Sequence, residues 1–293
     1  MQVLHTVAEL RTALAGQTGT AFVPTMGNLH AGHVSLIELA KRHGHPVVAS
    51  IFVNPLQFGA GEDFERYPRT LAADCEKLAA AGCDLVFAPD VDALYPVPQD
   101  FTVQPSDALT RDLCGAFRPG HFAGVATVVL KLFNLVQPHV AVFGKKDFQQ
   151  LRVIQELVRQ FNLPIEIVAG DTLRESDGLA MSSRNAYLGT AERIQAPQLQ
   201  RELTAVVAAV RAGERDFEAL CATAGRHLKM AGWRVDYVAL RDAATLQAPT
   251  PDSTRLVVLG AAWLGSTRLI DNIEWEAVSG EWLPAPHSPL TAV

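Results

Sequence analysis

The 293-residue chain has few cysteines, and its sequence contains neither a long uninterrupted apolar run nor a basic leader pattern. Its most apolar long stretch, residues 122–143, is interrupted by Lys131, Asn134 and Gln137, so no segment predicts a membrane span of ~18 or more apolar residues. Residues 1–14 lack the charged start and apolar block of an export signal. The four cysteines are irregularly spaced, which predicts reduced structural thiols and a cytoplasmic protein: Cys75, Cys83, Cys114 and Cys221.

Charge is also scarce. Charged residues make up 19% of the chain and the formal net charge is -6, which argues against a nucleic-acid partner because phosphates require a basic surface. The sequence also lacks the Gly-x-x-x-x-Gly-Lys-Ser/Thr loop, the Gly-x-Gly-x-x-Gly fingerprint and the Gly-x-Ser-x-Gly elbow. A bound nucleotide would therefore be held neither as in P-loop proteins nor as in dinucleotide-binding proteins.

What the sequence does contain is an alternation of apolar strand-like runs and helical periods, with hydrophobic residues at 48%. Strands are predicted at 20–23, 46–53, 84–88, 139–143 and 165–169. Helices are predicted at 1–14, 32–43, 70–81, 122–136 and 148–161. Such strands, rich in Val, Ile and Phe without polar alternation, indicate a parallel sheet covered on both faces. The fold class is therefore α/β, with a Rossmann-like open parallel sheet.

The pattern changes after about residue 172. Two long helical stretches, 191–212 and 216–230, precede strand-like runs joined by short connections, 235–240, 256–263 and 267–270. We expect residues 1–172 to form the Rossmann-like nucleotide-binding domain. Residues 173–293 are expected to form a smaller C-terminal α+β domain that closes over the nucleotide, with a poorly ordered end from Trp282.

A pair of histidines lies where the first buried strand turns into a helix. His30 and His33 are about one helical turn apart, and unpaired backbone N–H groups at a helix start attract anions. Gly27 and Gly32 allow a ligand to approach the backbone closely. The same pattern also fits a partial metal site or an ordinary polar helix start, although no third ligand lies at a helical offset. The sequence favours a phosphate site without excluding these alternatives.

Three further polar clusters follow predicted strands or the domain boundary. Residues 54–59 carry the amides Asn54 and Gln57, and residues 144–150 carry Lys146, with Asp147 as a helix cap. Residues 177–185 combine two hydroxyls with Arg184, groups that bind a polyphosphate. The clusters at 144–150 and 177–185 also fit solvated loops, so for these two the sequence alone leaves both interpretations open.

Six ordered motifs resemble one family: PTMGNLHAGH, SIFVNPLQFG, RPGHFAGV, FGKKDFQQ, RESDGLAMSSRN and STRLIDNI. Together they are similar to the pantothenate synthetase (pantoate–beta-alanine ligase) family, from about Phe22 to Ile273. That family belongs to the nucleotidyltransferase superfamily. Residues 30–33 resemble the HIGH-type signature of that superfamily, and residues 181–184 resemble its KMSKS-type signature. The resemblance implies a Mg²⁺-requiring ligase of the coenzyme A pathway that condenses pantoate with beta-alanine. ATP would be split to AMP and pyrophosphate through a pantoyl-adenylate, and the enzyme would be a cytoplasmic homodimer.

The resemblance also implies roles for individual residues, with His33 as the proton donor and His30 assisting at the ATP phosphates. The implied catalytic set is His30, His33, Lys146, Ser182, Ser183 and Arg184. The implied ATP-binding set is Met26, Gly27, Asn28, Leu29, His30, Ala31, Gly32, His33, Gly144, Lys145, Lys146, Asp147, Leu173, Met181, Ser182, Ser183 and Arg184. Gln57 and Gln150 would bind pantoate, with Gln57 also near beta-alanine, and no residue is assigned to a metal.

Three positions depart from what the resemblance leads us to expect, namely Ala31, Lys145 and Leu173. These departures bear on ATP affinity and rate more than on the reaction. An alternative reaction class is a nucleotidyltransferase that leaves the nucleotide on its product. A non-enzymatic ATP sensor is a second alternative.

Overall fold

The structure, a computed structural model of the chain, describes residues 1–276. The chain divides into two compact units, Met1–Ala186 and the part that begins at Tyr187. The boundary expected from sequence falls earlier, between Thr172 and Leu173, so the structure assigns residues 173–186 to the first unit. The proline-containing end from Trp282 lies outside the described residues.

The first unit is built on a six-stranded sheet in which every pairing is parallel, in the order β1-β4-β3-β2-β5-β6. Its strands are β1 (Gln2–Leu4), β2 (Ala21–Thr25), β3 (Val47–Ile51), β4 (Leu85–Phe87), β5 (Val140–Gly144) and β6 (Glu166–Gly170). Its longer helices are α1 (Val7–Ala13), α2 (Ala31–Ala40), α3 (Leu71–Ala81), α7 (His121–Val136) and α8 (Phe148–Gln160). Short helices lie between them: η1 (Pro55–Gln57), α4 (Val91–Leu94), α5 (Asp107–Thr110), α6 (Cys114–Phe117) and η2 (Lys145–Asp147). After β6, η3 (Ser183–Tyr187) reaches the first residue of the second unit.

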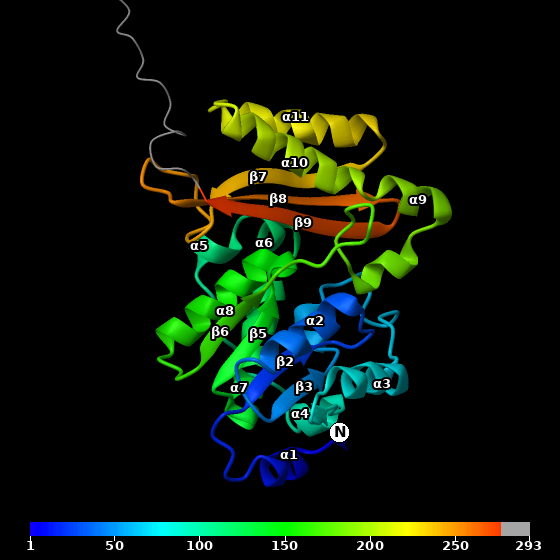
Figure 1. The fold of residues 1–293 in the computed structure, drawn as a ribbon, viewed down its shortest axis with the longest axis vertical. Coiled ribbons are helices and arrows are strands. Elements are labelled where there is room, and N and C mark those ends of the chain that lie inside the picture. The colour runs from blue at the N-terminus through cyan, green and yellow to red at the C-terminus, as the bar shows by residue number, and fades with distance from the viewer. Residues whose placement is uncertain (277–293) are drawn as a thin grey trace, which may run out of the picture. The chain divides into compact units, whose positions relative to one another are not determined.

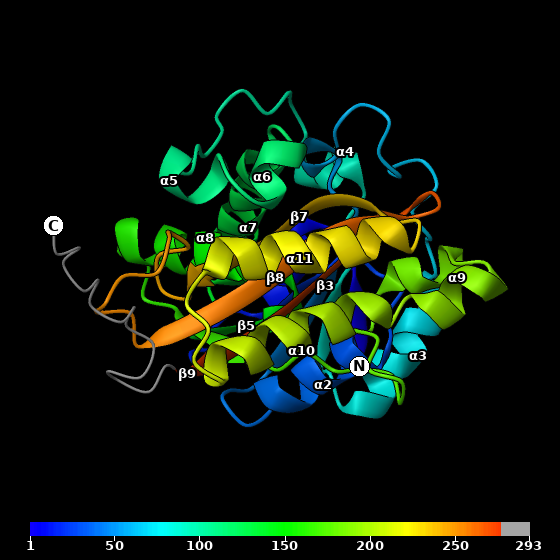
Figure 2. The same cartoon turned by 90° about the horizontal axis from the view of Figure 1, so that it is seen from above.

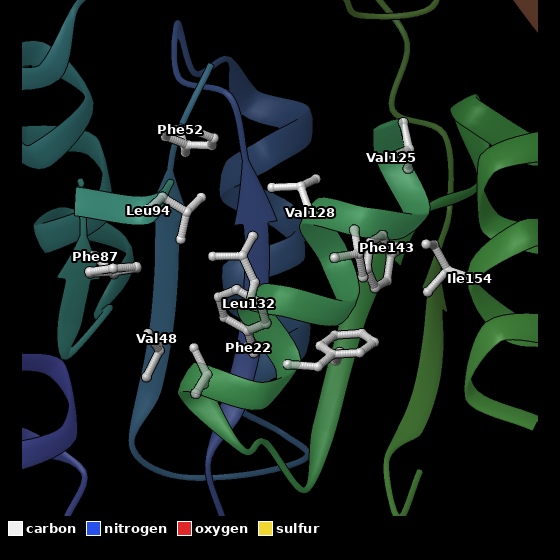
Figure 3. Packing of buried hydrophobic residues seen from close by; sticks show 14 of the residues in the cluster. Phe22, Val48, Phe52, Phe87, Leu94, Val125, Val128, Leu132, Phe143 and Ile154 are labelled. Atoms are coloured by element: carbon white, nitrogen blue, oxygen red, sulfur yellow. The ribbon is translucent and has the colours of Figure 1, made fainter. Parts of the chain in front are cut away.

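Both faces of this sheet are buried, which explains the continuous apolar strands. Phe22, Val48 and Phe87 point to one face and pack with α1, α7 and α8, and Figure 3 shows this cluster around Leu132 of α7. The alternate positions, Val23 among them, pack with α2 and α3 on the other face. The period of two within each strand divides the core into two layers, and the α/β fold class is confirmed.

The N-terminal segment differs from expectation. Residues 1–14 were expected to be a single helix, but Gln2–Leu4 form the edge strand β1, paired with β4, and only Val7–Ala13 are helical. Thr6 separates the two elements as an N-cap that accepts a hydrogen bond from the N–H of Glu9. A three-residue strand is too short to show a period of two, so its pairing with β4 decided the outcome.

The second unit contains a three-stranded antiparallel sheet in the order β7-β8-β9, seen from above in Figure 2. Its strands are β7 (Arg234–Asp242), β8 (Arg255–Leu264) and β9 (Thr267–Glu276), and its helices are α9 (Thr190–Gln195), α10 (Gln198–Arg211) and α11 (Phe217–Met230). Apolar residues of α10 and α11 pack against one face of this sheet. The helix expected over 191–212 is divided in two at Pro197, because proline lacks the N–H that would continue α9.

The order of the strands in the first unit determines where a ligand would bind. The chain runs from β2 through β3 to β4 on one side, then returns to place β5 on the other side of β2 (Figure 1). The strand order therefore reverses between β2 and β5. In open α/β sheets, ligands bind beyond the carboxyl ends of the strands at such a reversal.

Candidate active site

A pocket of about 220 Å³ lies at the carboxyl ends of β2, β3 and β5, and its lining residues fall between Pro24 and Arg184, within the first unit. It brings together most of the residues singled out from the sequence: Met26, His30, Gly32, His33, Gln57, Gly144, Lys146, Asp147, Gln150, Leu173, Met181, Ser182, Ser183 and Arg184. Five others do not line it: Gly27, Asn28, Leu29, Ala31 and Lys145. Its apolar wall comes mainly from α7 and from the ends of β3 and β5.

The first part of the site is the start of α2. His30 is the N-cap, with extended backbone, and its Nδ1 accepts a hydrogen bond from the N–H of Gly32 at 3.1 Å. The Nδ1 of His33 accepts from the N–H of His30 at 3.2 Å. The ring centroids lie 4.1 Å apart. The two imidazoles thus serve as a reciprocal cap for the helix that carries them.

These hydrogen bonds also determine where each ring carries its proton. Because both Nδ1 atoms accept, the proton of each neutral imidazole lies on Nε2, the nitrogen that is left to bind a ligand in the pocket that both rings line. Burial, followed by the charges of His33 and Lys146, lowers the pKa of His30 to about 3. Burial lowers the pKa of His33 to about 4, although the nearby Asp147 carboxylate raises it. Near pH 7 the pair is neutral and donates through Nε2–H.

Asp74 of α3 holds the loop that leads into this helix. Its buried carboxylate accepts from the N–H groups of Asn28 and Leu29, each at 2.8 Å, and from the hydroxyl of Thr70 at 3.0 Å. Gly27 and Asn28 both have positive φ there, 87° and 51°. A Cβ at Gly32 would lie 2.9 Å from Cε1 of His30, so this glycine makes room for the imidazole. The loop is thus shaped by a carboxylate that sequence reasoning did not assign to it.

The second part of the site follows β3. Asn54 is buried and donates through Nδ2 to Oε1 of Gln57 and to the carbonyl of Gly124, both at 3.2 Å. A Cβ at Gly124 would lie 2.1 Å from the carbonyl oxygen of Leu56, so only glycine lets α7 approach η1 this closely. The amide pair is therefore built into the contact between a loop and a helix.

The third part follows β5. Lys146 and Asp147 both line the pocket, and their Nζ and Oδ2 atoms lie 3.7 Å apart. Asp147 occupies the N-cap position of α8, but its side chain makes no capping hydrogen bond, so the expected cap is wrong. Desolvation raises the pKa of Asp147, but the charges of Lys146 and Arg184 outweigh it and lower this pKa below the usual value. Lys145 instead pairs with Asp171 at 2.7 Å.

The fourth part is the segment 181–184. The Ser183 hydroxyl donates to the carbonyl of Asn28 at 2.9 Å, which ties this segment to the histidine loop. Arg184 donates through Nε and Nη2 to the two carboxylate oxygens of Asp63, at 3.0 and 2.9 Å. Although desolvation raises the pKa of Asp63, this bidentate pairing lowers it overall. The hydroxyls and the guanidinium singled out from the sequence therefore lie beside the histidine pair.

A third histidine, His121, lies at the start of α7 and has both ring nitrogens engaged. Its Nε2 faces Nη1 of Arg118 at 2.9 Å, and because arginine only donates, Nε2 accepts. The proton is then on Nδ1, which donates to the carbonyl of Gln57 at 2.8 Å. Arg118 in turn pairs in bidentate fashion with Glu62, at 2.7 and 2.6 Å. His121 supports the backbone beside Gln57 and does not line the pocket.

Sequence reasoning missed the residues that hold the site, chiefly Asp63, Asp74 and Tyr95. Asp63 is 121 positions from Arg184 in the chain. Asp74 is 46 positions from Asn28 and 45 positions from Leu29. No local spacing signals such pairings. Within residues 1–276, no group of three or more His, Cys, Asp or Glu side chains is arranged to hold a metal ion. No helix in this range is both long and apolar enough to cross a bilayer.

Comparison with known proteins decides the family. A family model described as pantoate-beta-alanine ligase matches residues 2–274. The chain belongs to this family. The resemblance stated from the six motifs, and the assignment to the ligases, are thereby confirmed.

Similar members of the pantoate-beta-alanine ligase family span almost the whole chain. The pantothenate synthetase of Thiobacillus denitrificans is 73% identical over 280 residues, 96% of this chain and 99% of that protein. The crystal structure of pantothenate synthetase from Thermus thermophilus has a TM-score of 0.89 at 46% identity, covering 93% of this chain and 99% of that one. Pantoate-beta-alanine ligase from Francisella tularensis, in complex with beta-gamma ATP and beta-alanine, has a TM-score of 0.74 at 33% identity, covering 93% and 97%.

Proposed function

We propose that this protein condenses pantoate with beta-alanine to give pantothenate, with ATP split to AMP and pyrophosphate through a pantoyl-adenylate. Membership of the family supports the overall reaction, and the Francisella relative was crystallised with beta-gamma ATP and beta-alanine. The observation that carries the proposal is that His30 and His33 line the same pocket as Gln57 and Gln150. Donors for a phosphate and amides for a small acid thus share one cavity.

The chemistry explains why an acid site and a phosphate site must be adjacent. A carboxylate oxygen of pantoate attacks the α-phosphorus of ATP, and the bond to pyrophosphate breaks. The amine of beta-alanine then attacks the acyl carbon of the mixed anhydride, AMP leaves, and the amine loses a proton. Orientation of the bound amine supplies ~7 kcal/mol or more in such a step, so no covalent enzyme intermediate is required.

The residues of the pocket have distinct roles in the first step. Negative charge accumulates on the departing pyrophosphate, where Lys146, Ser182, Ser183 and Arg184 would bind it. His33 would donate its Nε2–H to a phosphate oxygen, with His30 beside it. A single preorganised donor of this kind is worth about 3 to 4 kcal/mol in a site that excludes water.

Magnesium belongs to the proposal as an ion carried by the nucleotide. Mg²⁺ is usually held by one or two carboxylates together with substrate phosphates, and the pocket offers the carboxylate of Asp147 beside Lys146. The carboxylate of Asp147 fits such an ion, which would neutralise charge on the phosphates, while Lys146 would act on the phosphates and not on the ion. Asp74 is committed to backbone N–H groups and is not available for it.

Exchange of labelled pyrophosphate into ATP tests the proposal. Exchange should require pantoate but not beta-alanine, and AMP should be released in stoichiometric amount only when beta-alanine is added. Exchange that does not depend on pantoate would contradict the adenylate. Product that retains the nucleotide after beta-alanine is added would favour a nucleotidyltransferase, and ATP binding without exchange would favour a sensor.

Three further expectations form part of the proposal. We infer closure of the C-terminal part, residues 173–293, over bound ATP, tested by hydrogen exchange of 181–184 with and without ATP and pantoate. Because 181–184 lie in the first compact unit, their contacts with the pocket do not themselves need closure.

The proposal also includes a homodimer, which is tested by light scattering. A cytoplasmic location accords with four cysteines that form no disulfide within residues 1–276, and it is tested by fractionation.

A further inference from the structure

Asn54 stands at the centre of a polar chain that runs from outside the pocket to Gln57. Its Oδ1 accepts from the N–H of Leu56 at 3.2 Å and from the hydroxyl of Tyr95 at 2.8 Å. Its Nδ2 donates to the Gly124 carbonyl and to Gln57 Oε1. The buried amide thus uses two acceptor and two donor positions, its full capacity.

Two backbone groups determine which way this amide faces. The N–H of Leu56 can only donate and the carbonyl of Gly124 can only accept, so Oδ1 and Nδ2 of Asn54 cannot be exchanged. It follows that Tyr95 donates its proton to Asn54. It also follows that Gln57 turns its Oε1 to Asn54 and its Nε2 to the other side, where it contacts Sδ of Met26 at 2.9 Å. The Oε1 of Gln57 is therefore engaged by Asn54, and its Nε2, which donates one N–H to Met26, keeps one N–H for a ligand in the pocket that Gln57 lines.

Tyr95 is held by ring contacts while its hydroxyl donates to Asn54. It follows α4 and its ring packs edge-on against Phe52, with centroids 5.8 Å apart. The ammonium of Lys131 lies 4.7 Å from the ring centroid on its face. Burial raises the pKa of the Tyr95 hydroxyl, so it remains a donor throughout the physiological range. Tyr95 does not itself line the pocket.

We propose that Tyr95 is a positioning residue: through Asn54, its hydroxyl holds the Gln57 amide so that Gln57 offers its remaining N–H to an oxygen atom of the acid substrate. This rests on the proposed function for the identity of the acid. Donors match a carboxylate or hydroxyl oxygen and mismatch an ammonium group. Gln57 would therefore select the acid through its oxygen atoms and would not hold the protonated amine of beta-alanine.

The test is the Tyr95→Phe variant, which removes one hydroxyl and keeps the ring against Phe52 and Lys131. Loss of a neutral hydrogen bond of ~1 kcal/mol predicts a KM for pantoate raised about 3- to 10-fold, with the KM for ATP within twofold of wild type. Thr127→Val is the matched control. Its buried hydroxyl also makes two hydrogen bonds, to Ala123 and from Val103, but neither joins the Asn54 network. Its KM for pantoate should stay within twofold.

An equal rise of both KM values in Tyr95→Phe, or an unchanged KM for pantoate, would overturn the proposal. Side-chain NMR of glutamine-labelled protein gives a second readout that needs no turnover. The Gln57 NH₂ signals, assigned through Gln57→Glu, should shift or broaden in Tyr95→Phe and stay in place in Thr127→Val. Identical signals in wild type and Tyr95→Phe would also overturn it. If the wild-type protein shows no pantoate-dependent pyrophosphate exchange, the proposed function is wrong. The NMR measurement would still test the link from Tyr95 to Gln57 in that case.

Discussion

Two helices begin beside the pocket with histidines, and they differ in what those histidines can do. At the start of α2, His30 and His33 accept backbone N–H groups through Nδ1 and keep Nε2–H for a ligand. At the start of α7, Nε2 of His121 accepts from Arg118, and Nδ1 donates to the Gln57 carbonyl. Burial lowers the pKa of His121 to about 4, as it does that of His33. Burial and pKa do not distinguish the two roles, whereas hydrogen-bond partners do.

The difference also shows how a neutral helix start can serve a highly charged substrate. His30 and His33 contribute oriented N–H groups without positive charge at neutral pH. The positive charges that act on them are those of Lys146 and Lys77. Lys146, and Arg184 in the same pocket, each have a carboxylate close by. Before ATP binds, Lys146 and Arg184 are therefore each paired with a carboxylate and are not desolvated without a partner.

The largest expected effect separates the two helix starts directly. His33→Ala removes a donor that would act on the transferring phosphate, so we expect pantoate-dependent pyrophosphate exchange to fall ~100- to 1,000-fold. His121→Asn, whose amide can still donate to the Gln57 carbonyl, should retain exchange within about 10-fold. His33→Gln, which restores an N–H near the Nε2 position, should recover part of the loss. Equal losses in His33→Ala and His121→Asn would break the comparison.

A smaller effect is expected from the carboxylate that holds the histidine loop. Asp74→Ala would leave the N–H groups of Asn28 and Leu29 without their acceptor, at about 1 to 3 kcal/mol for each buried group. Asp74→Asn keeps one acceptor oxygen and should lose less. We expect the thermal midpoint to fall and the KM for ATP to rise in the order wild type, Asn, Ala. An unchanged KM for ATP in Asp74→Ala would show that the loop keeps its shape without this anchor.

On the α7 side, the expected effect is on stability more than on catalysis. Glu62→Gln weakens the bidentate pair with Arg118, and the side chains of both partners are largely buried. The loss of one charged partner predicts destabilisation of about 1 to 3 kcal/mol, with kcat changed less than His33→Ala changes it. Asp107→Asn, which affects a pair with Arg111 whose side chains are both exposed, is the control and should cost under about 1 kcal/mol. Denaturant unfolding of the two variants measures the difference.

The sequence predicted the residues that face the pocket better than those that hold them in place. The sheet could be predicted because strands buried on both faces carry uninterrupted Val, Ile and Phe, and the motifs could be placed because the ends of parallel strands share one edge. The strand at Gln2–Leu4 is too short for a periodic signal. Asp74, Asp63 and Tyr95 were missed because their partners lie far away in the chain, and only the folded sheet brings them together. His121 stands in the motif RPGHFAGV, but the sequence could not show that both of its ring nitrogens are engaged, because the Gln57 carbonyl lies 64 positions away in the chain.

The last expected effect, and the one that treats both helix starts alike, is the pH dependence of stability. His30, His33 and His121 have folded pKa values of about 3, 4 and 4, against an ordinary value of 6.5. Above pH 6.5 both the folded and unfolded forms of these groups are neutral, so stability is fully present there. As pH falls from 6.5 towards 4, the unfolded chain binds protons that the folded chain excludes, and stability is lost.

The thermal midpoint should therefore fall as the pH is lowered from 7.5 to 5. His33→Asn and His121→Asn should each reduce the slope of the midpoint against pH by a similar amount. Bound ATP should separate them, because its phosphates would favour protonation of His33 more than that of His121. A slope unchanged in both variants would show that these imidazoles are not protected from protons as their burial predicts.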